Sequence, residues 1–209
     1  VGTEVHSSGI NLSTEGRDTA VLFGDGAAAA ILGPTDDGDR GVLAVRTHAD
    51  GKYAEKLWAP APACKSKPFI SAEMIEAGLT RPHMEGRDVF KHAVTKMPAA
   101  LNEVLEVAGY SIDDLDMVVP HQANMRIAQA VAKGLGLADD KMYVNIQRYG
   151  NTTAASIPIA LHECVEEGGI QRGDLVGFTA FGSGLTRRGA LVRWKSRPQS
   201  ATLPPRVFV

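Results

Sequence analysis

Three loops in this chain carry groups that can bind a small ligand. One holds His121, a second holds Asn151, and the third is the glycine-rich run Gly182-Ser183-Gly184. A histidine ring and a carboxamide can each donate a hydrogen bond to a ligand oxygen. A glycine-rich loop can bring backbone N–H groups close to the same ligand. Three such loops in succession indicate a shared binding or catalytic site more than packing alone.

The first loop lies between two expected elements of an α/β fold. Residues 115–119 are apolar and β-branched, which predicts a buried strand, and residues 125–135 have apolar side chains at helical spacing. His121 therefore follows the C-terminal end of a strand, where α/β sheets bind ligands because the loops diverge there. Alternation of strands and helices predicts a mostly parallel sheet with helices on both faces.

Other stretches predict the remaining elements. The glycines at 24 and 26 predict a hairpin between the strands on either side of them. Further strands are expected over 2–6, 19–24, 27–32, 41–48, 141–146, 174–181 and 188–194, and further helices over 86–109 and 153–167.

Five motifs resemble those of the β-ketoacyl-acyl-carrier-protein synthase III family, which belongs to the thiolase superfamily. In family order they are Phe23-Gly24-Asp25-Gly26-Ala27, Met84-Glu85-Gly86-Arg87-Asp88-Val89-Phe90-Lys91, Pro120-His121-Gln122-Ala123-Asn124, Gly150-Asn151-Thr152-Thr153-Ala154-Ala155-Ser156-Ile157-Pro158 and Phe181-Gly182-Ser183-Gly184-Leu185-Thr186. The resemblance implies an α/β, thiolase-like layered αβαβα fold, with the end of its first half and its complete second half present. It divides the chain into first-half strands, a connecting insertion, the second half and a tail, at 1–48, 49–83, 84–194 and 195–209.

The resemblance also implies a reaction. In the family, a cysteine is acylated by acyl-CoA, malonyl-acyl-carrier protein loses carbon dioxide, and the resulting carbanion attacks the thioester. His121 and Asn151 would hold the negative charge on the malonyl thioester oxygen. Backbone N–H groups of the loop 182–184 would stabilise the other oxyanion, that of the tetrahedral intermediate at the acyl-cysteine. The family commonly has a third glycine where this chain has Ser183.

Further site residues follow from the same resemblance. Substrate or coenzyme A contacts are expected from Arg17, Phe90 and Asn124, and docking of the acidic carrier protein from Arg126 assisted by Lys91. A carboxylate, at position 18, follows Arg17 where the family usually has glycine. A negative charge beside a phosphate site opposes phosphate binding.

The nucleophilic cysteine of the family has no counterpart in this chain. Cys64 lies in a proline-rich loop and Cys164 in a predicted helix, and neither has a context that would activate a thiol. The first residue is Val1 and a strand follows at once, so we expect a partial chain that is inactive alone and belongs to an acyltransferase. Two alternatives stay open: a relative that passes the acyl group to an oxygen or nitrogen acceptor, and a non-catalytic subunit that pairs with a complete synthase.

Composition limits the other possibilities. The chain has 209 residues, 44% of them hydrophobic and 22% charged, and a net charge of −2 at pH 7. That balance suits one or two globular units and does not indicate a nucleic-acid footprint. No apolar run approaches membrane-spanning length, and the two cysteines lack metal-site spacing. Together with the resemblance, these features predict a cytoplasmic homodimer whose acyl-CoA and phosphopantetheine are substrates, with no metal or other cofactor.

Overall fold

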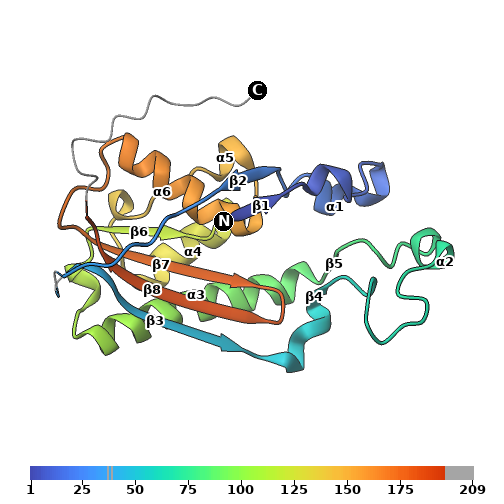
Figure 1. Ribbon diagram of the computed structural model, residues 1–209, viewed down its shortest axis with the longest axis horizontal. Helices are drawn as coiled ribbons and strands as arrows, with labels where there is room; N and C mark the ends of the chain where they lie inside the picture. The colour runs from blue at the N-terminus through green and yellow to red at the C-terminus, as the bar shows by residue number, and fades with distance from the viewer. Residues whose placement is uncertain (37, 39, 196–209) are drawn as a thin grey trace.

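A four-stranded mixed sheet forms the centre of the molecule (Figure 1). The computed structural model describes residues 1–36, 38 and 40–195. Strands β6 and β7 run parallel, whereas β7–β8 and β8–β3 are antiparallel. All four residues of β6 are buried, as expected for a strand with helices over both faces. In sheet order the strands are β3 (Gly41–Ala49), β8 (Thr186–Arg193), β7 (Leu175–Gly182) and β6 (Met117–Pro120).

Helix α3 (Gly86–Ala108) covers one face of this sheet, together with α4 (Met125–Leu135). Its side chains at Met97, Leu101 and Val104 are fully buried, and each contributes roughly 1.5–3 kcal/mol by leaving water. The helix ends at Gly109, whose φ of 74° is the left-handed conformation that glycine adopts easily. The predicted helices over 86–109 and 125–135 are therefore present, with α4 spanning the predicted range.

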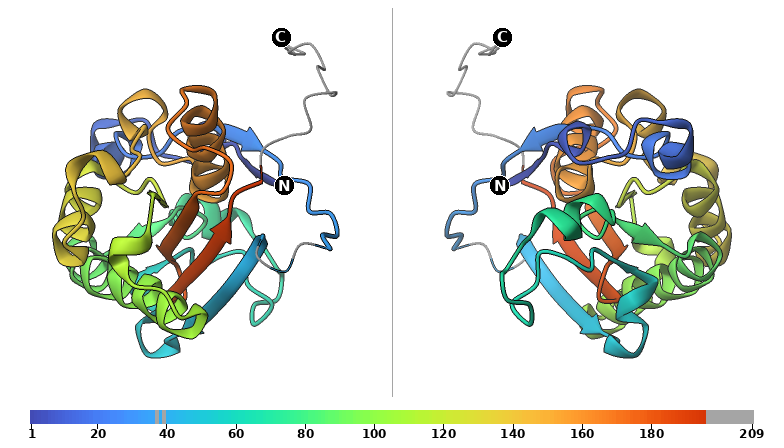
Figure 2. Two further views of the ribbon diagram at one scale, coloured as in Figure 1. Left: turned by 90° about the vertical axis from the view of Figure 1, so that its left-hand side faces the viewer. Right: turned by 90° about the vertical axis from the view of Figure 1, so that its right-hand side faces the viewer.

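Helix α6 (Ser156–Glu166) covers the opposite face and follows the 3-10 turn η6 (Thr153–Ala155). Ala160 and Cys164 pack against Val119 and Val176 of the sheet. A two-stranded antiparallel sheet, β1 (Gly2–Glu4) and β2 (Gly26–Ala28), lies on the far side of α6 (Figure 2). The order of sheet, helix and second sheet confirms the α/β class with helices on both faces.

The other elements are short. Strands β4 and β5 pair with each other beside the N-terminus of α3. Within residues 1–36, 38 and 40–195, no helix is long and apolar enough to cross a bilayer. The short elements are η1 (His6–Ser8), η2 (Thr14–Gly16), α1 (Arg17–Ala20), η3 (Gly51–Lys56), β4 (Leu57–Trp58), α2 (Ala72–Glu76), β5 (His83–Met84), η4 (Ile112–Asp114), η5 (Asp139–Lys141) and α5 (Ile146–Tyr149).

The predicted strand at 19–24 and its hairpin are wrong. Residues 17–20 form α1, and β2 pairs with β1. Long-range hydrogen bonds explain the difference. The Gly24 N–H donates to the carbonyl of Asn151 at 3.0 Å, and the carboxylate of Asp25 accepts from the N–H and hydroxyl of Ser7 at 2.9 and 2.5 Å. These partners draw residues 22–25 toward the loop at 151 and the turn after β1.

The predicted strand at 141–146 and the mostly parallel sheet are also wrong. Only one parallel bridge, between Val118 and Met142, joins that segment to β6. The N–H of Asn145 then donates to Oε1 of Gln122 at 3.0 Å, and the chain turns away into α5. β8 returns beside β7 as a hairpin, so the sheet has a single parallel pair.

The division at residue 48 does not coincide with a boundary between sheets. Strand β3, which ends the predicted segment 1–48, pairs with β8 from the segment 84–194. The four predicted ranges stay a prediction. Most of the tail, 196–209, lies outside the described residues.

Candidate active site

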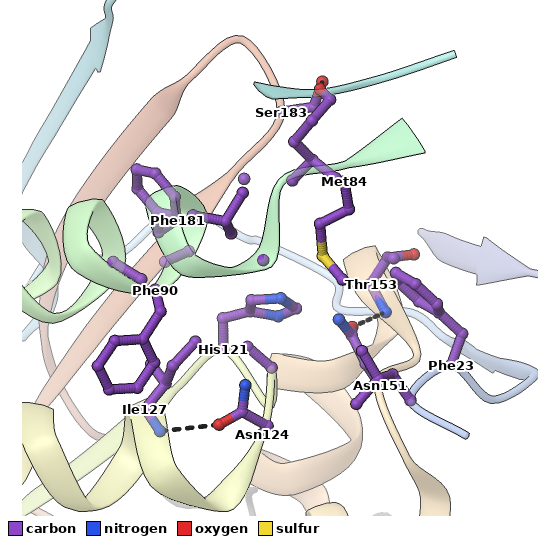
Figure 3. Close-up of a pocket in the computed structure, with 18 of the residues that line it drawn as sticks. Phe23, Met84, Phe90, His121, Asn124, Ile127, Asn151, Thr153, Phe181 and Ser183 are labelled. Atoms are coloured by element: carbon purple, nitrogen blue, oxygen red, sulfur yellow. Dashed lines mark hydrogen bonds between the residues drawn. The ribbon is translucent and has the colours of Figure 1, made fainter. Parts of the chain in front are cut away.

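A cavity of about 1340 Å³ brings most of the predicted site residues together (Figure 3). It opens where the ends of β6 and β7 meet the N-terminal ends of α3 and α4 and the loop before α6. Gly184 and Arg17 do not line it, and the Arg17 side chain is largely exposed on α1. The predicted residues that do line it are Phe90, Lys91, His121, Asn124, Arg126, Asn151, Gly182 and Ser183.

The two asparagines have their carboxamide oxygens occupied by backbone donors. Oδ1 of Asn151 accepts from the N–H of Thr153, and Oδ1 of Asn124 accepts from the N–H of Ile127, both at 2.9 Å (Figure 3). Asn124 is thereby the N-cap of α4, which supports the loop that carries His121. In each asparagine the NH2 group is left as the donor, because the oxygen has been used. Asn151 therefore offers an N–H to a ligand in the cavity.

His121 is held from two sides. Its backbone N–H donates to the carbonyl of Thr179 at 2.8 Å, which fastens the loop to the end of β7. The side-chain Nδ1 lies 2.7 Å from Oγ of Ser156, the first residue of α6. The ring reaches into the same part of the cavity as Asn151 (Figure 3). Burial lowers the pKa of His121 to about 4, so the imidazole is neutral at pH 7.

The lowered pKa of this half-buried histidine predicts a pH-dependent stability. The folded-state pKa of about 4 lies below the ordinary value of 6.5, so between these pH values the unfolded chain binds more protons than the folded chain. The free energy of unfolding should therefore fall by about 2–3 kcal/mol as the pH falls from 6.5 to 4. Urea unfolding of the chain and of His121→Gln over this range measures the effect. An equal decline in both proteins would show that His121 does not cause it.

The Asn151 loop is fixed by the segment that contains the first motif. Phe23 and Asn151 form a parallel bridge, and the N–H of Asn151 donates to the carbonyl of Leu22 at 2.8 Å. A Cβ at Gly24 would lie 2.0 Å from the carbonyl oxygen of Tyr149, so only glycine fits there. Thr153 has a φ of 41°, the one positive value at a non-glycine position in the described chain. Such strain often occurs at functional sites.

Gly150 gives a direct test of this arrangement. Its φ of 68° and ψ of −164° form a combination that side chains other than glycine rarely adopt, and an added Cβ would lie 3.0 Å from the Leu22 carbonyl oxygen. Gly150→Ala should lower the free energy of unfolding by about 1–3 kcal/mol. Gly9→Ala is the matched control, because Gly9 has an ordinary φ and open space, and should change stability by less than about 0.5 kcal/mol. Equal effects in urea unfolding would contradict the assigned strain.

The glycine-rich loop accommodates its serine without strain. Ser183 has no positive φ, whereas Gly184, with φ 131°, does. The Ser183 hydroxyl donates to the carbonyl of Leu57 at 2.6 Å and so connects the loop to β4. The loop joins β7 to β8 as a tight turn. The loop can thus still offer a backbone N–H donor, although Ser183 stands where the family commonly has glycine.

Neither cysteine belongs to the cavity. Cys64 is exposed, and Cys164 is buried between α6, to which it belongs, and the sheet. Burial raises the pKa of the Cys164 thiol to about 11, which disfavours the thiolate that a nucleophile requires.

Several lining residues were not predicted from the sequence. Nε2 of His6 lies 3.3 Å from the hydroxyl of Thr153, and the His6 ring makes a tilted contact with Phe23. Arg188 lines the wall formed by β8. Ser156 lies inside the fourth motif, but only its contact with His121 gives it a role. No local pattern could have found His6, because it comes from the turn after β1.

The mixed sheet between two helical layers, with a histidine and an asparagine at one cavity, defines a protein of the thiolase-like class. Two family models match this chain and agree with that class. The model for the C-terminal part of 3-oxoacyl-[acyl-carrier-protein (ACP)] synthase III matches residues 105–194, and the companion model of the same synthase matches residues 1–51. The chain belongs to the β-ketoacyl-acyl-carrier-protein synthase III family.

Individual relatives include synthases III and a related β-ketosynthase. A β-ketoacyl-[acyl-carrier-protein] synthase III of Clostridioides difficile is 46% identical over 194 residues, which are 93% of this chain and 57% of the relative. A solved synthase III from Thermus thermophilus is 41% identical with a TM-score of 0.81, over 92% of this chain and 57% of that one. The priming β-ketosynthase of the R1128 polyketide pathway is 33% identical with a TM-score of 0.79, over 94% and 56%. This chain thus spans less than three fifths of the length of these relatives.

Proposed function

We propose that this chain supplies the decarboxylating part of a β-ketoacyl-acyl-carrier-protein synthase III, which condenses acyl-CoA with malonyl-acyl-carrier protein. The observation that carries the proposal is the convergence of His121 and Asn151 on one cavity. Both present N–H donors, and the described residues that line the cavity include no aspartate or glutamate whose charge would oppose an incoming anion. The names of the relatives support the same reaction.

The neutral state of His121 fits this role. Loss of carbon dioxide from a malonyl thioester places negative charge on the thioester oxygen as an enolate forms. Two preorganised donors stabilise that charge more than they stabilise the uncharged thioester, which lowers the barrier. A histidine with a pKa of about 4 donates a hydrogen bond at neutral pH without carrying a charge of its own.

The rest of the cavity suits an acyl chain and a pantetheine arm. Its walls are largely apolar, and the basic side chains that line it belong to α3, α4 and β8. The apolar and aromatic lining comes mainly from Leu22, Phe23, Leu57, Trp58, Met84, Phe90 and Phe181, and the basic side chains are Arg87, Lys91, Arg126 and Arg188.

Arg126 is proposed to dock the acidic carrier protein. It is exposed in the first turn of α4, at the cavity, and Lys91 lies on α3 at the same cavity. In a full-length synthase that carries these residues, Arg126→Ala should weaken carrier-protein binding about 3–10-fold and reduce its salt dependence, because rim charges act mainly on encounter. Lys133→Ala, an exposed cation at the other end of α4, should change neither. If wild type and Arg126→Ala gave equal binding curves over a salt series, Arg126 would not be a docking residue for the carrier protein.

The decisive test of the function is product formation. A full-length synthase that carries these residues should release carbon dioxide from malonyl-acyl-carrier protein and form a β-ketoacyl product. Transfer of the acyl group to an oxygen or nitrogen acceptor without carbon dioxide would instead support the related acyltransferase. The pathway served, the homodimer and the cytoplasmic location stay predictions.

A further inference from the structure

The hydrogen bonds around Ser156 determine which nitrogen of His121 carries the hydrogen. Ser156 is 2% exposed, and its Oγ has two contacts. One is Nδ1 of His121 at 2.7 Å, and the other is the backbone N–H of Gln122 at 3.4 Å. No other partner of this hydroxyl occurs among the described residues.

A buried hydroxyl hydrogen needs an acceptor, because leaving it unpaired away from water is costly. The Gln122 N–H is a donor and cannot serve. Nδ1 of His121 is therefore the acceptor, and the Ser156 O–H donates to it. If Nδ1 itself carried the hydrogen, the Ser156 oxygen would face two donors and its own hydrogen would have no partner.

The hydrogen of a neutral imidazole lies on one nitrogen only. With Nδ1 accepting from Ser156, the hydrogen is on Nε2. No protein partner is assigned to Nε2 in the described part of the chain, and the ring extends into the cavity that Asn151 also lines.

We propose that Ser156 is a positioning residue that fixes His121 as the Nε2–H tautomer and so directs an N–H donor into the cavity. The tautomer follows from the hydrogen bonds, whereas its value for decarboxylation rests on the proposed function. In this state Nε2 cannot accept a proton, so His121 acts as a hydrogen-bond donor to a developing oxyanion and not as a general base.

Nitrogen NMR of the 209-residue chain with labelled histidine tests the tautomer directly. At pH 7 we expect the His121 signals, assigned by their loss in His121→Gln, to show a protonated Nε2 and an unprotonated, hydrogen-bonded Nδ1. Ser156→Ala should shift the Nδ1 signal and allow both tautomers, whereas Ser156→Thr, which keeps the hydroxyl, should retain the wild-type pattern. Ser8→Ala, at an exposed serine, is the control and should change nothing. A protonated Nδ1 in the wild-type chain would overturn the proposal without any variant having to fold.

Measuring carbon dioxide release tests whether the His121 tautomer matters for decarboxylation. In a full-length synthase that carries these residues, Ser156→Ala should reduce carbon dioxide release about 10–100-fold, the range seen when the hydrogen-bond partner of a metal-binding histidine is removed. Ser156→Thr should recover most of it. Altered NMR signals with unchanged carbon dioxide release would overturn the positioning role. No carbon dioxide release by the wild-type synthase would refute the proposed function, and the NMR result would still decide the tautomer.

Discussion

Replacing His121 or Asn151 by alanine in a full-length synthase that carries these residues should reduce malonyl decarboxylation by about 10²–10³-fold each. The cysteine of that synthase should still take up acetyl from acetyl-CoA. The reason is the timing of the charge: both side chains act on an oxygen that becomes negative only during decarboxylation. Acylation of the cysteine uses backbone donors of the loop 182–184 instead.

Two single-turnover measurements check this division: acyl transfer to the cysteine, and carbon dioxide release from malonyl-acyl-carrier protein. The double variant should lose less than the product of the two single losses, because both donors serve one oxygen. Gln129→Ala, at an exposed position on α4 away from the cavity, is the control and should retain both half-reactions. If His121→Ala slowed acyl transfer as much as decarboxylation, the histidine would be the general base of the cysteine, which would also contradict the tautomer inferred from Ser156.

Residues 1–209 alone should form no β-ketoacyl product from acyl-CoA and malonyl-acyl-carrier protein. Among the described residues that line the cavity there is no thiol to accept the acyl group, because Cys64 is exposed elsewhere and Cys164 is a buried thiol with a pKa raised to about 11. Incubation with radiolabelled acetyl-CoA, followed by intact mass measurement, should show no acyl group on either cysteine. The control is a full-length synthase under the same conditions, which should retain label on its nucleophile.

Label on Cys64 that remains in the chain and is never transferred to product would be unspecific acylation of an exposed thiol. A Cys64→Ser variant identifies it, because the label should disappear with that thiol. Label on either cysteine that is chased into a β-ketoacyl product on addition of malonyl-acyl-carrier protein would show that this chain has its own nucleophile. The proposed division of the site between this chain and further residues of a synthase would then be wrong.

The sequence by itself determined the features that depend on near neighbours in the chain. Helix α3 and helix α4 follow from apolar spacing, and α3 ends at Gly109, whose cap acts within one turn. The types and order of the site residues, His121 and Asn151 above all, were visible for the same reason. A loop residue after a predicted strand needs no tertiary information to be recognised as a candidate.

Only the tertiary structure decided the features that depend on partners far along the chain. The segment 19–24 has the composition of a strand, yet it joins no named sheet, because the Gly24 N–H donates to the carbonyl of Asn151 and the neighbouring Asp25 carboxylate accepts from Ser7. The segment 141–146 leaves the sheet because Gln122 binds the N–H of Asn145. Ser156 contacts His121 across 35 positions of sequence. Such contacts form only when the elements pack together, because no local periodicity encodes which buried donor will meet which acceptor.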